Sequence, residues 1–274
     1  YGKPAERITE MMGHATTVMF GPEDLRIVRD GPAARRRFID MQLSQIRPSY
    51  LKQLQRYLST LENRNALLKA CRCDGGASVD AQLDAWDEQL AAAATGVVEA
   101  RRWFLAELAV NATAQYAAIA EDVAETFALR YVGPLATADD PARQMLASLK
   151  RTRAEDKARL FTSYGPHRDD LALLLCGKEL RAFGSQGQLR TAVLSMKLGE
   201  IALIENEMGE TPTLLLDDVF SELDARRRNA LLKSAEGVQT FLTCTDKADA
   251  AGAHADAFYQ VKATPEGKAT LVEG

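Results

Sequence analysis

Residues 183–224 restrict the fold of this chain more than any other stretch, because they join a glycine-containing loop, a helical pattern and a short apolar run. After the loop at residues 184–188, apolar residues from Leu189 to Ile204 recur mostly three or four positions apart, which predicts a half-buried helix. The run at residues 213–216 is too short for a helix and apolar enough for a buried, parallel strand. The stretch therefore predicts an α/β fold.

The polar groups at the two ends of this helix–strand unit suit phosphate chemistry. Two glycines let the loop backbone approach a phosphate closely, and the N-terminus of the following helix attracts anions. The strand ends in Asp217 and Asp218, at the place where open α/β sheets bind ligands, and carboxylate oxygens suit Mg²⁺. An acidic pair after a strand is also typical of helix capping or of a turn, so the pair alone leaves both interpretations open.

The order of segments extends this pattern. SELD follows at residues 221–224, then a helical segment around residues 230–232, then a strand at residues 238–243 that leads to Thr245 and Asp246. This order resembles the C-terminal half of an ABC-type ATPase head, with its signature loop, Walker B strand, D-loop and switch loop. The forms SQGQ and LLLDDVFSELD resemble the RecF family of bacterial recombination-repair ATPases, which are related to SMC heads.

Two further stretches carry the same resemblance. PEDLRIVRDGPAARRRFID, at residues 22–40, is similar to the first RecF family signature, and GPHRDD, at residues 165–170, resembles a segment that precedes the family's signature loop. The resemblance covers residues 1 to about 260 in the same order. It implies the C-terminal portion of an ABC-type P-loop ATPase head, an α/β fold, with an inserted all-helical lobe.

The resemblance also implies cofactors and residue roles. ATP and Mg²⁺ would be bound, with Asp217 in the Mg²⁺ shell and Asp218 orienting or deprotonating the attacking water. Thr245 stands where many ABC heads have a histidine and would contact the γ-phosphate. Because ABC heads hold ATP between two subunits, the other matched residues would meet the second copy's nucleotide or line the dimer interface: Ser185, Gly187, Gln188, Ser221 and Asp224.

By the same resemblance, the function is that of an ATP-gated dimer that binds DNA in recombinational repair and replication restart. It would assist the loading of recombinase at single-strand gaps, with RecR and RecO as partners, in the cytoplasm. Duplex DNA and junctions between single-stranded and duplex DNA are the expected ligands.

The loop that would cradle the β- and γ-phosphates is missing from the sequence, which contains no G-x-x-x-x-G-K-[ST]. In RecF-like proteins this loop precedes the point where the chain starts, so an N-terminally truncated sequence is expected, and this chain alone is expected to be inactive as an ATPase. A non-enzymatic module that binds DNA or a partner is the alternative. A transporter ATPase subunit fits poorly because of the long helical insertion before the signature.

Three parts are expected along the chain. Residues 1–34 and 161–274 belong to the ATPase lobe, and residues 35–160 form a helical arm, because residues 38–158 have a helical pattern almost throughout. The basic clusters at residues 35–37 and 150–159 are interpreted as solvated helix faces, with DNA contact as the alternative for the first. Further expected elements are a helix at 6–13, strands at 15–20, 171–176 and 180–183, and a hairpin of 258–262 with 270–272.

Charge and cysteine spacing add exclusions. The net charge of −4 points to no nucleic acid by itself, so a DNA site would be a local patch. No apolar run approaches the length of a membrane span. The four cysteines lack the paired spacing of a zinc site and indicate reduced thiols. His167, Arg168, Asp169 and Asp170 form either an acid–base set or a loop crosslinked by Arg–Asp pairs, and no catalytic role is assigned to them.

Overall fold

Three parallel strands form the sheet that organises the C-terminal part of the molecule. The computed structural model describes residues 16–70, 77–120, 124–246, 255–263 and 269–273. Strand β5 (Thr213–Asp217) lies between β1 (Thr17–Phe20) and β6 (Thr240–Thr243), and both neighbours run parallel to it. The predicted parallel strand is confirmed, although β5 is buried on one face only. The carboxyl ends of all three strands meet at one edge of the sheet.

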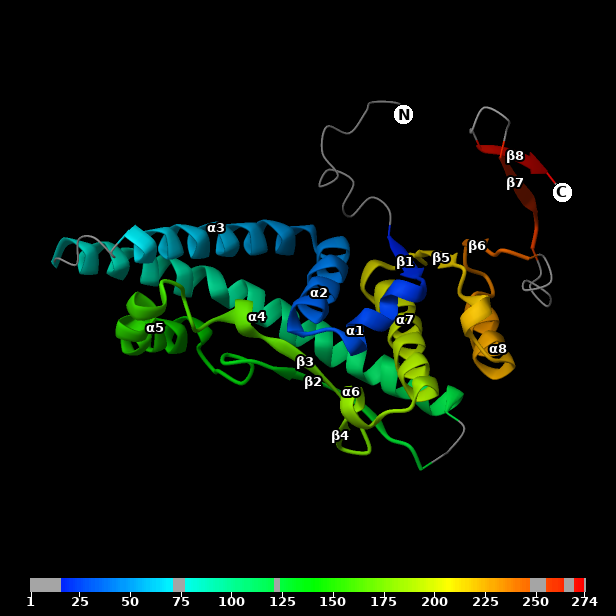
Figure 1. The fold of residues 1–274 in the computed structure, drawn as a ribbon, viewed down its shortest axis with the longest axis horizontal. Coiled ribbons are helices and arrows are strands. Elements are labelled where there is room, and N and C mark those ends of the chain that lie inside the picture. Colours follow the sequence, from blue (N-terminus) through cyan, green and yellow to red (C-terminus); the bar gives the residue numbers. More distant parts are fainter. Residues whose placement is uncertain (1–15, 71–76, 121–123, 247–254, 264–268, 274) are drawn as a thin grey trace.

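Helix α7 (Gln186–Met208) covers one face of this sheet, as Figure 1 shows. Val18, Leu214 and Leu216 alternate along the strands and are buried. On the opposite face, Met19 and Phe241 lie in one row across Leu215 and are 51% and 58% exposed. Burial on one face only explains why β5 alternates between buried and half-buried side chains.

The 43-residue helix α4 (Ala77–Ile119) runs through the molecule. It packs against α7, against α3 (Pro48–Ala70) and α5 (Pro141–Arg159), and against the strand β2 (Phe127–Val132) (Figure 1). Helices α3 and α5 and the first part of α4 form the elongated end of the molecule. Helix α2 (Pro32–Ile46) gives way to α3 at Pro48, as expected.

A second, antiparallel sheet has the order β2-β3-β4, with β3 at Asp170–Leu175 and β4 at Lys178–Glu179. The expectation that residues 38–158 are helical almost throughout is wrong at β2, which pairs with all six residues of β3. A helical pattern in the flanks does not reveal a strand whose hydrogen-bond partner lies some 40 positions further along the chain. The expected division at residues 34/35 and 160/161 stays a prediction.

The second expected strand at residues 180–183 is wrong, because this segment is the helical turn α6 (Leu180–Phe183). The amide of Gly184 donates to the carbonyl of Leu180 at 2.9 Å, and pairing with β3 stops at Glu179. A strand there would have no neighbour to complete its backbone hydrogen bonds, so the chain turns instead toward α7.

Short elements complete the chain. Within the described residues, the 3₁₀ turns are η2 (Pro22–Leu25), η3 (Pro166–Arg168) and η4 (Phe220–Glu222), and the remaining helices are α1 (Arg26–Arg29) and α8 (Ala225–Ser234). The expected closing hairpin is confirmed as β7 (Tyr259–Ala263) with β8 (Ala269–Glu273). The helix expected at residues 6–13 lies outside the described residues.

The basic clusters are not simply solvated helix faces. Arg35 is buried and its Nε lies 2.6 Å from Oδ1 of Asp170, whereas Arg37 is exposed. Arg153 on α5 lies 2.6 Å from both Asp84 and Asp87 of α4. Carboxylates that are far away in the sequence neutralise these arginines, which is why the sequence pattern alone misassigned them.

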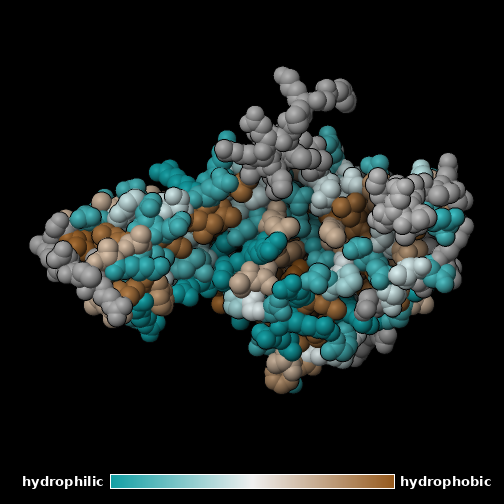
Figure 2. Space-filling model, turned by 45° about the horizontal axis from the view of Figure 1, so that its top comes forward, coloured by the Kyte–Doolittle hydropathy of each residue, from teal (hydrophilic) through white to brown (hydrophobic). Residues whose placement is uncertain are grey.

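The surface view in Figure 2 shows hydrophobic residues in several separate places among hydrophilic ones. In the described part of the chain, no helix is long and apolar enough to cross a membrane.

Candidate functional site

The candidate site lies at the edge where the three parallel strands end. Asp217 is the last residue of β5 and is exposed, and Asp218 follows it directly. Gly21, just after β1, lies beside Asp217, since an added Cβ would be in ordinary van der Waals contact with the Cβ of Asp217, at 3.6 Å. Thr243 ends β6 on the other side. This edge is where open α/β sheets bind their ligands.

Thr243 holds both aspartates. Its Oγ1 donates to Oδ1 of Asp217 at 2.7 Å, and the same oxygen accepts from the backbone amide of Asp218 at 3.1 Å. The Asp218 amide also points to the carbonyl oxygen of Thr243, 3.2 Å away. Thr243 was not among the predicted site residues, although its position at the end of a strand parallel to β5 is a signal that identifies it.

Asp218 has a backbone φ of +49°, in the left-handed region that residues with side chains seldom adopt. The two contacts with Thr243 and the hydrogen bond from Ser221 Oγ to the Asp218 carbonyl, at 2.9 Å, hold this conformation. A conformation maintained in this way sets the direction of the Asp218 side chain, and such strained residues cluster at functional sites.

The donor set fits a magnesium ion held jointly with a ligand. Mg²⁺ is usually bound by one or two carboxylates together with phosphate oxygens and waters. Asp217 offers an exposed carboxylate at the strand end. Among the described residues there is no group of three or more His, Cys, Asp or Glu side chains that could enclose a metal ion. The residues present therefore suit the shared type of site and not a protein cage.

Ser185 caps α7, which begins at Gln186 and not at Leu189 as expected, so Gly187 and Gln188 lie in the first helical turn. The Ser185 Oγ accepts from the Gln188 amide at 3.2 Å, and the Gln188 Oε1 accepts from the Ser185 amide at 2.7 Å. This reciprocal capping starts the helix earlier than its apolar spacing indicates. We refer to residues 185–188 as the signature turn.

The signature turn is also held from outside. The Nε2 of Gln188 donates to Oε1 of Glu125 at 2.5 Å, and Oε2 of Glu125 accepts from the Tyr116 hydroxyl at 2.8 Å. Arg29 of α1 donates to the side chain of Gln186. These contacts leave Ser185 and Gln186 exposed on a turn whose backbone is anchored.

Residues 221–224, which we call the D-loop segment, follow the sheet edge. Ser221 is exposed and contacts the Asp218 carbonyl, and Asp224 is exposed and caps α8 by accepting from the Arg227 amide at 2.9 Å. Thr245 lies two residues beyond β6 and is exposed. The structure thus groups Asp217, Asp218 and Ser221 at one edge, and the roles predicted for all these residues stay predictions.

A buried ionic cluster stands behind the edge and was not anticipated from the sequence. The Gly21 amide donates to Oδ2 of Asp24 at 2.8 Å, and Oδ1 of Asp24 lies 3.2 Å from Nζ of Lys197 on α7. Glu200, one turn further along α7, has its Oε1 3.6 Å from the same ammonium group. The cluster connects the turn after β1 to the centre of the helix that begins with the signature turn.

The loop at residues 165–170 is crosslinked by Arg–Asp pairs, but with arginines from other elements. Arg101 of α4 pairs with Asp169 and Arg35 of α2 pairs with Asp170. Burial lowers the pKa of His167 to about 4, so its ring is neutral at physiological pH. Its Nε2 donates to the Thr162 carbonyl at 3.0 Å, and its Nδ1 accepts from the Tyr57 hydroxyl at 2.6 Å. A histidine that stays neutral in this position is a structural partner of Tyr57.

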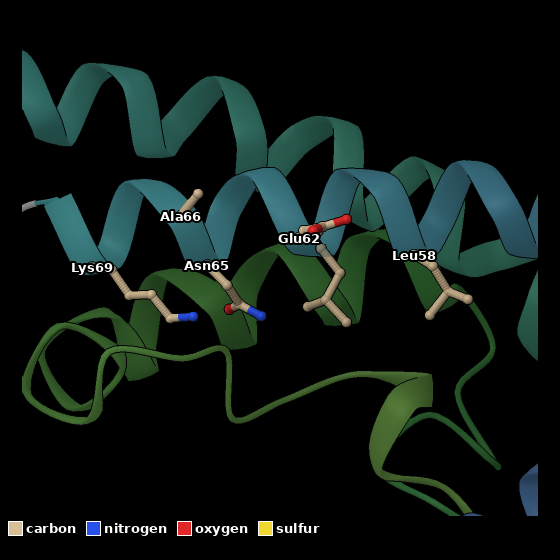
Figure 3. A pocket seen from close by; sticks show the side chains of 6 residues that line it. Leu58, Glu62, Asn65, Ala66 and Lys69 are labelled. Atoms are coloured by element: carbon tan, nitrogen blue, oxygen red, sulfur yellow. The ribbon is translucent and has the colours of Figure 1, made fainter.

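A hollow of about 320 Å³ lies elsewhere, along α3 (Figure 3). No strand of the parallel sheet contributes to the described wall of this hollow, and α3 lies apart from that sheet in Figure 1. Its lining residues are Leu58, Leu61, Glu62, Asn65, Ala66 and Lys69.

The parallel sheet with its acidic edge, the capped helix before it and the D-loop segment after it define the C-terminal portion of an ABC-type P-loop ATPase head with an inserted helical region. The chain belongs to the RecF family. It is 39% identical over 246 residues to the DNA replication and repair protein RecF of Alkaliphilus oremlandii. The aligned region covers 88% of this chain and 66% of that protein. It is also 39% identical over 249 residues to the RecF of Acetivibrio thermocellus, covering 89% and 67%.

Solved structures agree with this assignment. The recombination mediator protein RecF-ATPrS in the RecFOR pathway superposes with a TM-score of 0.86 at 33% identity, covering 98% of this chain and 71% of that one. RecF-ATP of the same pathway superposes with a TM-score of 0.85 at 34% identity. No family model matches the chain. The chain spans about two thirds of the length of the curated relatives it matches.

Proposed function

We propose that this chain is the part of an ATP-dependent DNA replication and repair protein that supplies the Walker B edge, the signature turn and the D-loop segment. The observation that carries the proposal is the pair Asp217 and Asp218 at the end of β5, held by Thr243, in a chain 34% identical to a RecF structure with ATP. Phosphoryl transfer requires a metal-binding carboxylate and a group that orients the attacking water, and this edge provides candidates for both.

Asp217 would hold Mg²⁺ with its carboxylate, directly or through water. When bound, the ion would neutralise negative charge on the β- and γ-phosphates. Asp218 would orient the attacking water or deprotonate it. The left-handed backbone at Asp218 sets the direction in which its side chain leaves the main chain. The hydroxyl of Thr243 contacts the carboxylate of Asp217 and the backbone amide of Asp218, and so holds the two residues at the sheet edge.

The exposed signature turn and D-loop segment support a two-fold arrangement in which ATP closes a homodimer. Ser185, Gly187 and Gln188 would meet nucleotide held by the second copy, and Ser221 and Asp224 would lie at the interface. Thr245 would contact the γ-phosphate. In the whole protein, the phosphate-cradling loop would come from sequence that these 274 residues do not contain.

The names of the solved relatives also point to the partners of the whole protein. Two solved neighbours are mediators of the RecFOR pathway. We therefore propose that the whole protein binds duplex DNA and single-strand/duplex junctions, assists recombinase loading at gaps with RecR and RecO, and acts in the cytoplasm.

The catalytic assignment is tested with Asp218→Asn in the full-length protein. A water-orienting base contributes on the order of 10²–10⁴-fold, so ATP turnover should fall by at least about 100-fold while ATP still binds. The measurement is steady-state ATPase activity beside nucleotide titration. Asp139→Asn, an equivalent change at an exposed loop position, serves as the control and should turn over ATP normally. Wild-type turnover by Asp218→Asn would remove Asp218 from the mechanism.

A second candidate is a non-enzymatic module that binds DNA or a partner, favoured by the missing G-x-x-x-x-G-K-[ST] in this sequence. Titration of the 274-residue chain with duplex DNA in the absence of ATP distinguishes it. Tight binding without nucleotide favours the module, and binding only by the full-length protein with ATP favours the ATPase.

A further inference from the structure

Arg227 connects the two segments that the proposed function assigns to the dimer interface. It lies in the first turn of α8, directly after the D-loop segment, and its side chain reaches the first turns of α7, directly after the signature turn. The two segments are some 35 positions apart in sequence, and Arg227 bridges them within one chain.

Each part of the Arg227 guanidinium group has a different partner. Its Nε donates to Oγ1 of Thr191 at 2.8 Å. Its Nη1 pairs with the carboxylate of Asp224. Its Nη2 lies 3.1 Å from the position that a Cβ on Gly187 would occupy, so the guanidinium rests against the glycine of the signature turn. The side chain is only 15% exposed.

The partner atoms are themselves fixed. Thr191 is buried, and its hydroxyl donates to the Gly187 carbonyl at 2.9 Å, so its oxygen is positioned to accept from Arg227. At the other end, Asp224 caps α8 through Oδ1, which accepts from the Arg227 amide, while Oδ2 faces the guanidinium. Both ends of the bridge are thus anchored in helix starts, which have well-defined geometry.

We propose that Arg227, through Thr191, is a positioning residue that sets the spacing of the signature turn and the D-loop segment so that both engage a second copy at the same time. The inference rests on the proposed ATP-closed dimer. Arg227 is not assigned a contact with nucleotide. Arg227 would act by preorganisation. Because it already fixes the two segments relative to each other, dimer formation does not pay the conformational entropy of ordering them.

The test uses full-length protein with Arg227→Gln, and Arg226→Gln as the matched control, because Arg226 is the exposed neighbour on the same helix. ATP-dependent self-association is measured by sedimentation, and ATP affinity is measured on dilute monomer. Loss of a hydrogen bond from a charged group should weaken self-association roughly tenfold. Arg226→Gln should associate like the wild type, and monomer affinity for ATP should be unchanged in both variants.

The other end of the bridge gives an independent pair. Thr191→Val keeps the shape of the side chain but removes the acceptor, and should weaken association as Arg227→Gln does. Thr191→Ser keeps the hydroxyl and should restore association, which a purely space-filling role for Thr191 would not predict. Equal association by Arg227→Gln, Arg226→Gln and the wild type would overturn the inference. Absence of ATP-dependent association in the wild type would instead overturn the proposed function beneath it.

Discussion

At the scale of single residues, Glu200 is a carboxyl group buried in the protein interior. It is 1% exposed on α7, and neither of its carboxylate oxygens accepts a hydrogen bond from the described residues. Burial raises the pKa of Glu200 from 4.5 to about 8, although Lys197 lowers it in part. Lys197 is closer to Asp24 than to Glu200, so the ammonium group is already paired. Glu200 is therefore more stable in the protonated form at neutral pH.

This pKa shift predicts a pH dependence of stability. The folded state holds the Glu200 proton up to about pH 8, whereas the unfolded chain releases it near pH 4.5, so stability falls as pH rises between these values. Glu200→Gln stays neutral and should raise the melting temperature increasingly from pH 5.5 to 8, with a plateau above. Thermal melts across this range measure it, and Glu205→Gln, at an exposed position of the same helix, should give no such trend. A constant difference at all pH values would contradict the assignment.

At the scale of elements, helices α4 and α7 cross each other in close contact. A Cβ on Gly199 of α7 would lie 2.9 Å from the backbone nitrogen of Ala112 and 3.2 Å from its Cα on α4. Those are backbone atoms, which cannot rotate away. Glycine at this position lets the two helices approach closely, and this approach places the signature turn beside Glu125 and Tyr116.

The crossing predicts opposite signs for two glycine-to-alanine changes. In an open helix this change stabilises by up to about 1 kcal/mol, but Gly199→Ala should destabilise by about 1–3 kcal/mol, because the helices must separate. Gly96→Ala in α4 is the control. Its methyl would meet only the end of the Gln53 side chain, at 2.7 Å, which can rotate away. Chemical denaturation of both variants measures the difference, and a stabilised Gly199→Ala variant would refute the close crossing.

At the scale of the whole molecule, Arg101 joins the helical part to the loop at residues 165–170. Its Nη2 lies 2.9 Å from Asp40 of α2, and its Nη1 donates to the Pro166 carbonyl at 2.7 Å and lies 3.3 Å from Asp169. Arg101 is 2% exposed. Burial raises the pKa of Asp169 to about 6 despite this arginine. One buried cation therefore serves two carboxylates from different parts of the chain.

Removal of the Arg101 cation should lower the free energy of unfolding of the protein. Arg101→Met leaves Asp40 and Asp169 without their shared partner and should cost about 3–5 kcal/mol of stability. The loss should be smaller at pH 5 than at pH 8, because protonation neutralises Asp169 below its raised pKa. Denaturant unfolding at both pH values measures the effect, with Arg37→Met at an exposed position as the control. Similar stability of the two variants would show that Arg101 does not hold these parts together.

The sequence by itself determined those elements whose signal lies in residues close together along the chain. The apolar run that ends in Asp217 and Asp218, the helix from the signature turn onward and the closing hairpin all follow local periodicity and composition, and the structure contains them. Local signals suffice there because each such element satisfies its hydrogen bonds with nearby residues or shows one apolar face.

Only the tertiary structure decided features that depend on distant partners. The strand β2 exists because β3 pairs with it, and the segment at residues 180–183 turns into a helix because pairing with β3 ends before it. The partners of Arg35, Arg153 and Arg227, and the place of Thr243 beside Asp217, follow from packing across the chain. A buried charge is stable only beside an opposite charge, and a strand only beside another strand. The fold brings these partners together from distant parts of the chain, so no local sequence pattern specifies them.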